Sequence, residues 1–388
     1  MQTLSGERTG VINRTWIAAL LALAVSGQAA LAAQFFVSPN GNDKAIGGQG
    51  APFKTIQRAL EDAGPGDTVV LAPGRYKQDI KSVRDGRGGG PITITGPASA
   101  IVQGSGERDR VVEINHDHHV LKGFVIDGKV GSGKKGFRDK LIYVIGRSPG
   151  RGVTGFKAIG MTVRNAGGEC IRLRYLTNRA EIAGSRIGPC GAFDYQFKDG
   201  GKNGEGIYVG TGPEQLGKRG APDRRVDASN NNRIHSNVFN TNGNECVDIK
   251  EGSSGNIVEN NSCTGQRDKE SAGLNARGER NVFRNNKVFG NVGAGIRFGG
   301  DKTGQGVDNQ AYGNTLTDNK AGGFALQSGP QGKICDNRIS GGGPATFGRF
   351  KNYVDPTGPC SAFAWRERKD DKDDKGDNND DDDDDDDD

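Results

Sequence analysis

A repeated strand pattern constrains this chain more than any other feature of its sequence. Six segments share one alternation, in which the third and fifth residues are apolar and their neighbours vary. Alternation with a period of two is typical of β-strands, with the apolar residues facing inward and their neighbours outward. The segments are ECIRLR (169–174), EGIYVG (205–210), ECVDIK (245–250), AGLNAR (272–277), AGIRFG (294–299) and GGFALQ (322–327).

A second register, offset from the first, repeats Asn at both ends of a short strand. It reads NRIHSN, NIVENN, NVFRNN and NQAYGN, starting at Asn232, Asn256, Asn281 and Asn309, in steps of 24, 25 and 28 residues. This period, with strands only and Gly and Asn at the corners, predicts an all-β fold, a right-handed single-stranded parallel β-helix with one coil per repeat. We expect the Asn side chains to stack and hydrogen-bond from coil to coil.

The start of the chain predicts export. Residues 1–33 read as a secretory signal peptide, with basic residues early, an apolar stretch over 16–25, and Ala30 and Ala32 ahead of the expected cut. The apolar stretch is too short and badly flanked for a transmembrane anchor, so no membrane span is expected. The mature protein should be extracellular, or periplasmic in a bacterium.

The other end of the chain changes how the net charge is interpreted. Residues 369–388 hold 14 Asp and 3 Lys, a charge of −11 in a formal total of +4, and should be disordered. The β-helix domain expected over residues 34–368 is therefore basic, at about +14. A basic, exported solenoid, expected to be a monomer, predicts an acidic polysaccharide as partner. Nucleic acid is not expected, because no stacking platform or known motif accompanies the charge.

The cysteines predict disulfides. Six of them, at 170, 190, 246, 263, 335 and 360, form an even number in an oxidising compartment, and no CxxC or Cys/His cluster suggests a metal site. Fifteen pairings are possible, of which we single out Cys335 with Cys360 near the end of the solenoid.

The N-terminal part of the expected domain reads as strand, helix, turn and strand. Phe53, Ile56 and Leu60 would lie on one face of a short helix that covers the open end of the first coil. This stretch resembles the start of many secreted β-helix proteins, including pectate lyases, which implies a pectin-lyase-like solenoid.

Stacking the six strands places chemically active residues side by side, because neighbouring strands lie about 4.8 Å apart. The expected outward residues are those at the fourth and sixth positions of the pattern. They include Arg172, Arg174, Tyr208, Asp248, Lys250, Asn275, Arg277 and Arg297. With Arg280, just beyond the fourth strand, these residues predict a face that binds an anionic ligand.

Glu169, Glu205 and Glu245 precede three of the strands and should stack at one-coil spacing. Carboxylates this close raise one another's pKa or attract a cation, and Ca²⁺ is the natural candidate outside the cell. Alternatively, the Glu side chains form ion pairs with Arg172 or cap turns.

Lys250 and Arg277 occupy the same position on successive coils. A guanidinium one strand away disfavours protonated Lys, and would lower the pKa of Lys250 toward that of a general base. Cleavage of a uronate polysaccharide by β-elimination needs such a base, neutralisation of the adjacent carboxylate and a proton donor for the leaving oxygen. The alternative is two solvated cations on a basic face.

The order GEGIYVG, ECVDIK, SSGNIVENN, LNARGERN and GAGIRFGGD, over residues 204–301, is similar to polysaccharide lyase family 6, the alginate lyase and chondroitinase B group. The resemblance implies that Lys250 is the Brønsted base, Arg277 the catalytic acid, Glu245 a calcium ligand and Arg297 a substrate contact. In the family pattern, a second acidic ligand and a histidine would stand at the positions of two glycines, 243 and 278.

An insertion at residues 211–231 interrupts the coil and carries Lys218, Arg219, Arg224 and Arg225. It could clamp an anionic chain at the edge of the same face, or be a flexible loop that does not touch substrate.

The sequence thus predicts a secreted lyase that cleaves an alginate, pectate or glycosaminoglycan type of chain with the help of calcium. A uronan C5-epimerase and a non-catalytic glycan-binding or surface solenoid remain alternatives.

Overall fold

The computed structural model describes residues 32–106, 110–133, 136–192, 195, 203–218, 221–300 and 304–366. The acidic tail and all but the last two residues of the expected signal peptide lie outside these ranges. Among the described residues, no helix is both long and apolar enough to cross a membrane.

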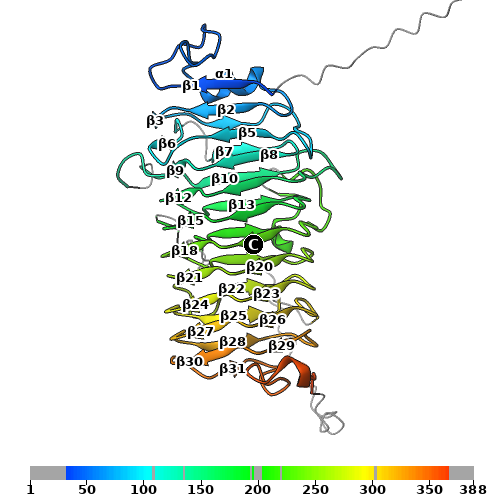
Figure 1. Ribbon diagram of the computed structural model, residues 1–388. Coiled ribbons are helices and arrows are strands. Elements are labelled where there is room, and N and C mark those ends of the chain that lie inside the picture. The colour runs from blue at the N-terminus through cyan, green and yellow to red at the C-terminus, as the bar shows by residue number, and fades with distance from the viewer. Residues whose placement is uncertain are drawn as a thin grey trace, which may run out of the picture. The chain divides into compact units, whose positions relative to one another are not determined.

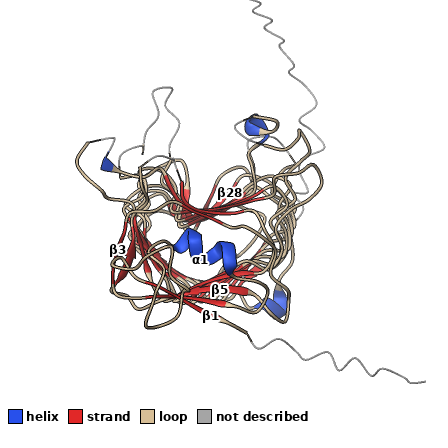
Figure 2. Cartoon of the chain, turned by 90° about the horizontal axis from the view of Figure 1, so that it is seen from above, coloured by secondary structure: helices blue, strands red, loops and turns tan. Residues whose placement is uncertain are grey.

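Three parallel sheets form the sides of a β-helix, as the repeats predict (Figure 1). Apart from β1, which pairs with β2, a strand in each sheet pairs with the strand three places further along the chain, so that each coil contributes one strand to every side. Seen from above, the three sheets surround a common interior (Figure 2). The described residues place 11 strands in sheet 1 and 10 strands in each of sheets 2 and 3.

Sheet 1 contains β1 (Gln34–Val37), β2 (Thr68–Leu71), β5 (Ile92–Thr95), β8 (His119–Lys122), β11 (Lys157–Ile159), β14 (Glu181–Ala183), β17 (Arg233–His235), β20 (Ile257–Glu259), β23 (Val282–Arg284), β26 (Gln310–Tyr312) and β29 (Ile334–Cys335). Sheet 2 contains β4 (Ile80–Lys81), β7 (Arg110–Ile114), β10 (Lys140–Ile145), β13 (Ile171–Arg174), β16 (Ile207–Val209), β19 (Val247–Ile249), β22 (Ala272–Ala276), β25 (Ala294–Phe298), β28 (Gly322–Leu326) and β31 (Thr346–Phe347). Sheet 3 contains β3 (Gly74–Tyr76), β6 (Ala100–Val102), β9 (Val125–Asp127), β12 (Thr162–Arg164), β15 (Arg186–Ile187), β18 (Val238–Asn240), β21 (Ser262–Thr264), β24 (Lys287–Phe289), β27 (Thr315–Thr317) and β30 (Arg338–Ser340).

The six strands of the sequence pattern are β13, β16, β19, β22, β25 and β28, all in sheet 2 and in the predicted register. Their inward residues, such as Ile207, Val247 and Leu274, are fully buried in one continuous core. Full burial of one such side chain contributes about 1.5–3 kcal/mol. The core column therefore fixes the register that positions the outer face of sheet 2.

The two Asn columns are internal ladders, as predicted. The side-chain oxygen of Asn256 accepts hydrogen bonds from the main-chain and side-chain nitrogens of Asn232, both at 2.9 Å, and Asn256 donates in the same way to Asn281. A parallel ladder runs through Asn237 and Asn261. Each ladder satisfies buried main-chain donors at a corner of the coil, where no sheet partner is present.

The short helix at the N-terminal end is α1 (Ile56–Asp62), with Thr55 as its N-cap. Ile56 and Leu60 are buried beneath it, and the helix contacts β1, β2 and β4. In Figure 2 it lies across the interior that the sheets surround. Phe53 is also buried, but it precedes the helix and bridges to Val37.

All six cysteines form disulfides: Cys170–Cys190, Cys246–Cys263 and Cys335–Cys360. The pairing singled out from the sequence is confirmed. Three disulfides are consistent with an oxidising, extracellular compartment.

Candidate functional site

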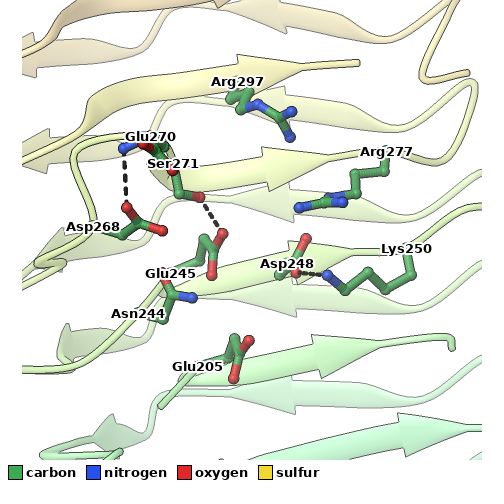
Figure 3. A pocket seen from close by; sticks show the side chains of 10 residues that line it. All are labelled: Glu205, Asn244, Glu245, Asp248, Lys250, Asp268, Glu270, Ser271, Arg277 and Arg297. Atoms are coloured by element: carbon green, nitrogen blue, oxygen red, sulfur yellow. Dashed lines mark hydrogen bonds and ion pairs between the residues drawn. The ribbon is translucent and has the colours of Figure 1, made fainter. Parts of the chain in front are cut away.

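A pocket of about 300 Å³ opens on the outer side of sheet 2, over β16, β19, β22 and β25 (Figure 3). Two of its side chains lie within β19 and β25, and the others belong to residues just before β16, β19 and β22 or just after β19 and β22. The pocket is lined by Glu205, Asn244, Glu245, Asp248, Lys250, Asp268, Glu270, Ser271, Arg277 and Arg297.

Three carboxylates meet in this pocket. Glu205 and Glu245 precede β16 and β19, and Asp248 lies in the middle of β19; one oxygen from each falls within 4.8 Å of the others. All three are at least 95% buried, with exposed fractions of 4%, 2% and 1%. The Oε2 atoms of Glu205 and Glu245 have no hydrogen-bond partner among the described residues. Converging, unpartnered oxygens of this kind fit a hard cation such as Ca²⁺.

The protonation of these groups follows from their surroundings. Burial, followed by the charges of Glu169 and Glu245, raises the pKa of Glu205 well above its ordinary value. Burial and the charge of Asp248 raise the pKa of Glu245 to about 7. The pocket therefore holds negative charge at an energetic cost, which a proton or a bound cation relieves.

Glu169 stacks in the same column but does not join the cluster. Its Oε1 accepts a hydrogen bond from Arg172 at 2.9 Å, and both side chains are buried. The Arg172 guanidinium also donates to Gln215 at 2.6 Å and lies 4.2 Å from the centre of the Tyr208 ring. The ion pair considered from the sequence therefore forms at Glu169, while Asp248 takes the third place in the carboxylate cluster.

Lys250 points into the pocket, with its Nζ 2.7 Å from Asp248 Oδ2 and 4.8 Å from the centre of the Tyr208 ring. Burial lowers its pKa, but the charges of Asp248 and Tyr208 outweigh burial and Arg277, so the pKa is raised overall. Arg277 does lower the pKa of Lys250, as expected, but the net shift is opposite to the expected one toward the pKa of a general base. Alignment of the repeats placed Asp248 on the same face but did not show that it pairs with Lys250.

The two arginines of the pocket stand on the next two coils. The Arg277 guanidinium lies 3.9 Å from Glu251, and Arg297 donates to Asn275 at 3.4 Å. Asn275 in turn donates to Asp248 at 3.0 Å. A line of polar contacts thus joins Arg297 to the carboxylate cluster through Asn275, which is fully buried.

The insertion packs over β13 and β16 and covers part of the predicted face. Arg174 is only 1% exposed and donates to Thr211 at 2.9 Å and to the Tyr143 hydroxyl at 3.0 Å. Tyr208 is 4% exposed, and its hydroxyl accepts from the Gly212 N–H at 3.3 Å. Arg174 and Tyr208 are therefore covered and are not available to a ligand on the outer face.

Arg280, the remaining residue predicted to bind substrate, lies outside the pocket. Its side chain is 62% exposed and pairs with Glu279 at 2.9 Å. Of the predicted basic residues in the insertion, Arg225 pairs with Asp223 at 3.3 Å, and Arg219 lies outside the described residues.

Four pocket residues were missed from the sequence: Asn244, Asp268, Glu270 and Ser271. Ser271 donates to Glu245 Oε1, and Asn244 Oδ1 is buried without a hydrogen-bond partner. Apart from Asn244, they belong to the turn before β22, which lies outside the aligned strands. Two acidic residues just before that strand, Asp268 and Glu270, were the sequence signal that could have identified this part of the pocket.

The glycines at the two positions where the family pattern has polar side chains are fixed by close backbone contacts. A Cβ on Gly243 would lie 2.4 Å from the Cys190 carbonyl oxygen, and one on Gly278 would lie 2.0 Å from that of Ser253. Neither position can carry a side chain without moving the backbone of a neighbouring coil. The chemistry of this pocket must therefore come from other residues, among them Asp248, which belongs to the carboxylate cluster, and Ser271, which donates to Glu245.

Comparisons with known proteins agree with this architecture. A family described as a right-handed β-helix region matches residues 202–355, and one described as a protein of unknown function (DUF1565) matches residues 39–84. Pectate lyase PEL9 of Emericella nidulans is 36% identical over 81 residues, which are 20% of this chain and 18% of that protein. The chain spans less than one fifth of the length of the curated relatives that it matches.

Two solved structures share the fold over most of their length. An alginate lyase from Paenibacillus sp. str. FPU-7 superposes with a TM-score of 0.60 at 22% identity, covering 80% of this chain and 99% of the other. Pectate lyase Pel9A gives 0.54 at 13% identity, covering 82% and 79%. The predicted resemblance is confirmed: the chain is a right-handed parallel β-helix of the kind found in polysaccharide lyases.

Proposed function

We propose that this protein is a secreted polysaccharide lyase that cleaves a uronate-containing chain by calcium-assisted β-elimination. The observation that carries the proposal is the pocket on sheet 2, where three buried carboxylates face Lys250, Arg277 and Arg297. The lyase names of the structural neighbours support the same class of reaction.

Glu205, Glu245 and Asp248 are the residues that would hold calcium. Their oxygens converge, they are buried, and two of those oxygens have no partner in the described residues. When bound, calcium supplies positive charge that offsets the three carboxylates and neutralises the carboxylate of a uronate, which makes the adjacent C5 proton more acidic.

In this proposal, side chains of the pocket carry out proton abstraction, protonation of the leaving oxygen and substrate binding. Lys250 takes the C5 proton, the electrons of that C–H bond form the C4=C5 double bond, and the C4–O bond to the leaving sugar breaks. Arg277 or a water next to it protonates the leaving oxygen, and Arg297 holds a substrate carboxylate. Because Asp248 stabilises the protonated form of Lys250, Lys250 must lose a proton before it can act as the base. The reaction should therefore show a requirement for a deprotonated group on the alkaline side.

The test is the absorbance of the unsaturated uronate formed by cleavage, with alginate, pectate and dermatan as substrates. We expect a signal on one of them that is lost with EDTA and reduced at least about 100-fold in Lys250→Ala. Lys140→Ala is the matched control, because Lys140 is also a part-buried lysine of sheet 2 paired with an aspartate, Asp139, at 2.5 Å, but lies outside the pocket. Absence of signal on every acidic glycan, or full activity of Lys250→Ala, contradicts the proposal.

The uronan C5-epimerase considered from the sequence shares proton abstraction and differs in product. Proton NMR of the treated polymer separates the two, since an epimerase changes the uronate composition without forming a double bond. Binding without any product, unchanged by Lys250→Ala, would instead identify a glycan-binding solenoid.

A further inference from the structure

The outer face of sheet 3 carries a column of cations that the pocket does not use. In-register pairing aligns the first residues of its strands, from Arg186 in β15 through Lys287 in β24 to Arg338 in β30. All three side chains are exposed, and none has an ion-pair or hydrogen-bond partner among the described residues. At about 4.8 Å per strand, they stand at roughly 14 Å and 10 Å from one to the next along the solenoid axis.

Several outward cations of sheet 1, in contrast, are paired with carboxylates. There, Lys157 pairs with Glu181 at 2.7 Å, and Arg233 and Arg284 both pair with Glu259, at 2.6 and 2.7 Å. From β15 to β30, the described outward positions of sheet 3 hold no Asp or Glu. Asp318 and Asp336 lie in the flanking turns, off both outward columns.

The residues between the cations are of types that can contact sugars. Phe289 is 41% exposed and Val238 45%, which is high for large apolar side chains in a protein with a continuous core. The other outward positions are hydroxyl and amide side chains: Asn240, Ser262, Thr264, Thr315, Thr317 and Ser340. An exposed aromatic ring can stack on the apolar face of a sugar, and hydroxyls and amides can bond to sugar hydroxyls.

We propose that the outer face of sheet 3, from β15 to β30, is a second, non-catalytic binding surface for an acidic polysaccharide lying along the solenoid axis. Charge complementarity selects the ligand, because a linear polyanion can place carboxylates along its length against Arg186, Lys287 and Arg338. The surface is separate from the pocket, whose side chains belong to strands of sheet 2 and to the residues that precede or follow those strands (Figures 1 and 3).

Binding is measured by calorimetry with sodium alginate and polygalacturonate, and with neutral dextran as the uncharged reference. All proteins carry Lys250→Ala, so that cleavage does not shorten the ligand. We expect the triple variant R186Q/K287Q/R338Q to bind an acidic polymer about tenfold more weakly, with a shallower dependence on salt. The control K122Q/R179Q/K333Q removes the same charge from exposed cations on the side of sheet 1 and should change affinity less than twofold.

A second measurement separates a sugar-binding surface from a merely basic one. Phe289→Ala should weaken binding of the polysaccharide and leave binding of polyglutamate unchanged. Equal losses in the two triple variants, or polyglutamate binding as tightly as alginate, would overturn the proposal. Binding that requires deletion of residues 369–388 would also overturn it, by assigning the surface to the acidic tail of this chain. These results do not depend on whether the sheet 2 pocket is a lyase site.

Discussion

Replacing Glu245 by Gln should stabilise the calcium-free protein at pH 8. Burial and the charge of Asp248 raise the pKa of Glu245 from 4.5 to about 7. The folded protein therefore holds this proton more tightly than the unfolded chain does, so the contribution of Glu245 to stability is fully present below pH 4.5 and is lost as the pH rises through 7. At about 1.4 kcal/mol for each pH unit, the loss amounts to about 3 kcal/mol. Gln resembles the protonated acid and can still accept the hydrogen bond from Ser271.

The measurement is urea unfolding of wild type and Glu245→Gln in EDTA, at pH 5 and pH 8. We expect the variant to be more stable by up to about 3 kcal/mol at pH 8 and nearly equal to wild type at pH 5. Calcium should then reverse the order, because it stabilises the wild type by binding to the native state and has lost a ligand in the variant.

Glu259→Gln is the control with the opposite sign. Although burial raises the pKa of Glu259, the hydrogen bonds from Arg284 and Arg233 outweigh it, so the pKa is lowered. Removing this charge should therefore cost stability at pH 8, and calcium should not restore it. A Glu245→Gln variant less stable than wild type at pH 8 in EDTA, or a stability difference that does not change with pH, would refute the reasoning.

Three further predictions concern the framework around the pocket. Asn261→Ala removes four ladder hydrogen bonds and should lower the free energy of unfolding by about 4 kcal/mol, whereas exposed Asn240→Ala should change it by less than about 0.5 kcal/mol in the same urea titration. Asp227→Ala removes the acceptor that holds the insertion at two main-chain N–H groups and a threonine hydroxyl, and should speed proteolytic cleavage within the insertion. Replacing Cys246 and Cys263 by Ala should cost about 3 kcal/mol and weaken calcium binding measured by calorimetry, because this disulfide starts at the residue after a pocket carboxylate.

The fold could be predicted in detail because its determinants are local and repeat. Alternation predicts the inward residues of sheet 2, and the spacing of Asn232, Asn256 and Asn281 predicts the ladders. Both features arise from contacts between equivalent positions of successive coils, so aligning the repeats of the sequence predicts which residues are in contact. The conformations of the turns could not be predicted from the sequence, because they depend on packing and do not repeat with a fixed period.

The candidate site was predicted in part for the same reason. Alignment brought together Glu205, Glu245, Lys250 and Arg277, which do line one pocket. It could not show that Arg172 pairs with a buried Glu and thereby withdraws that Glu from the carboxylate cluster. Choice among ion-pair partners depends on side-chain direction and burial, and the strand register fixes neither.

Two of the three carboxylates, Glu245 and Asp248, lie on a coil whose backbone is held by a disulfide and by Asn ladders. Cys246 stands between Glu245 and Asp248 in sequence and is tied to Cys263, and the ladder residues Asn256 and Asn261 close the same coil. Buried like charges repel, and a flexible turn would relieve the repulsion by moving the carboxylates apart. A braced backbone prevents this movement, so the charges stay close together and the relief must come from a proton or a cation. Because the coil is rigid, repulsion between the carboxylates favours binding of a proton or a cation. Neutralising Glu245 should therefore raise the stability of the calcium-free protein and weaken calcium binding.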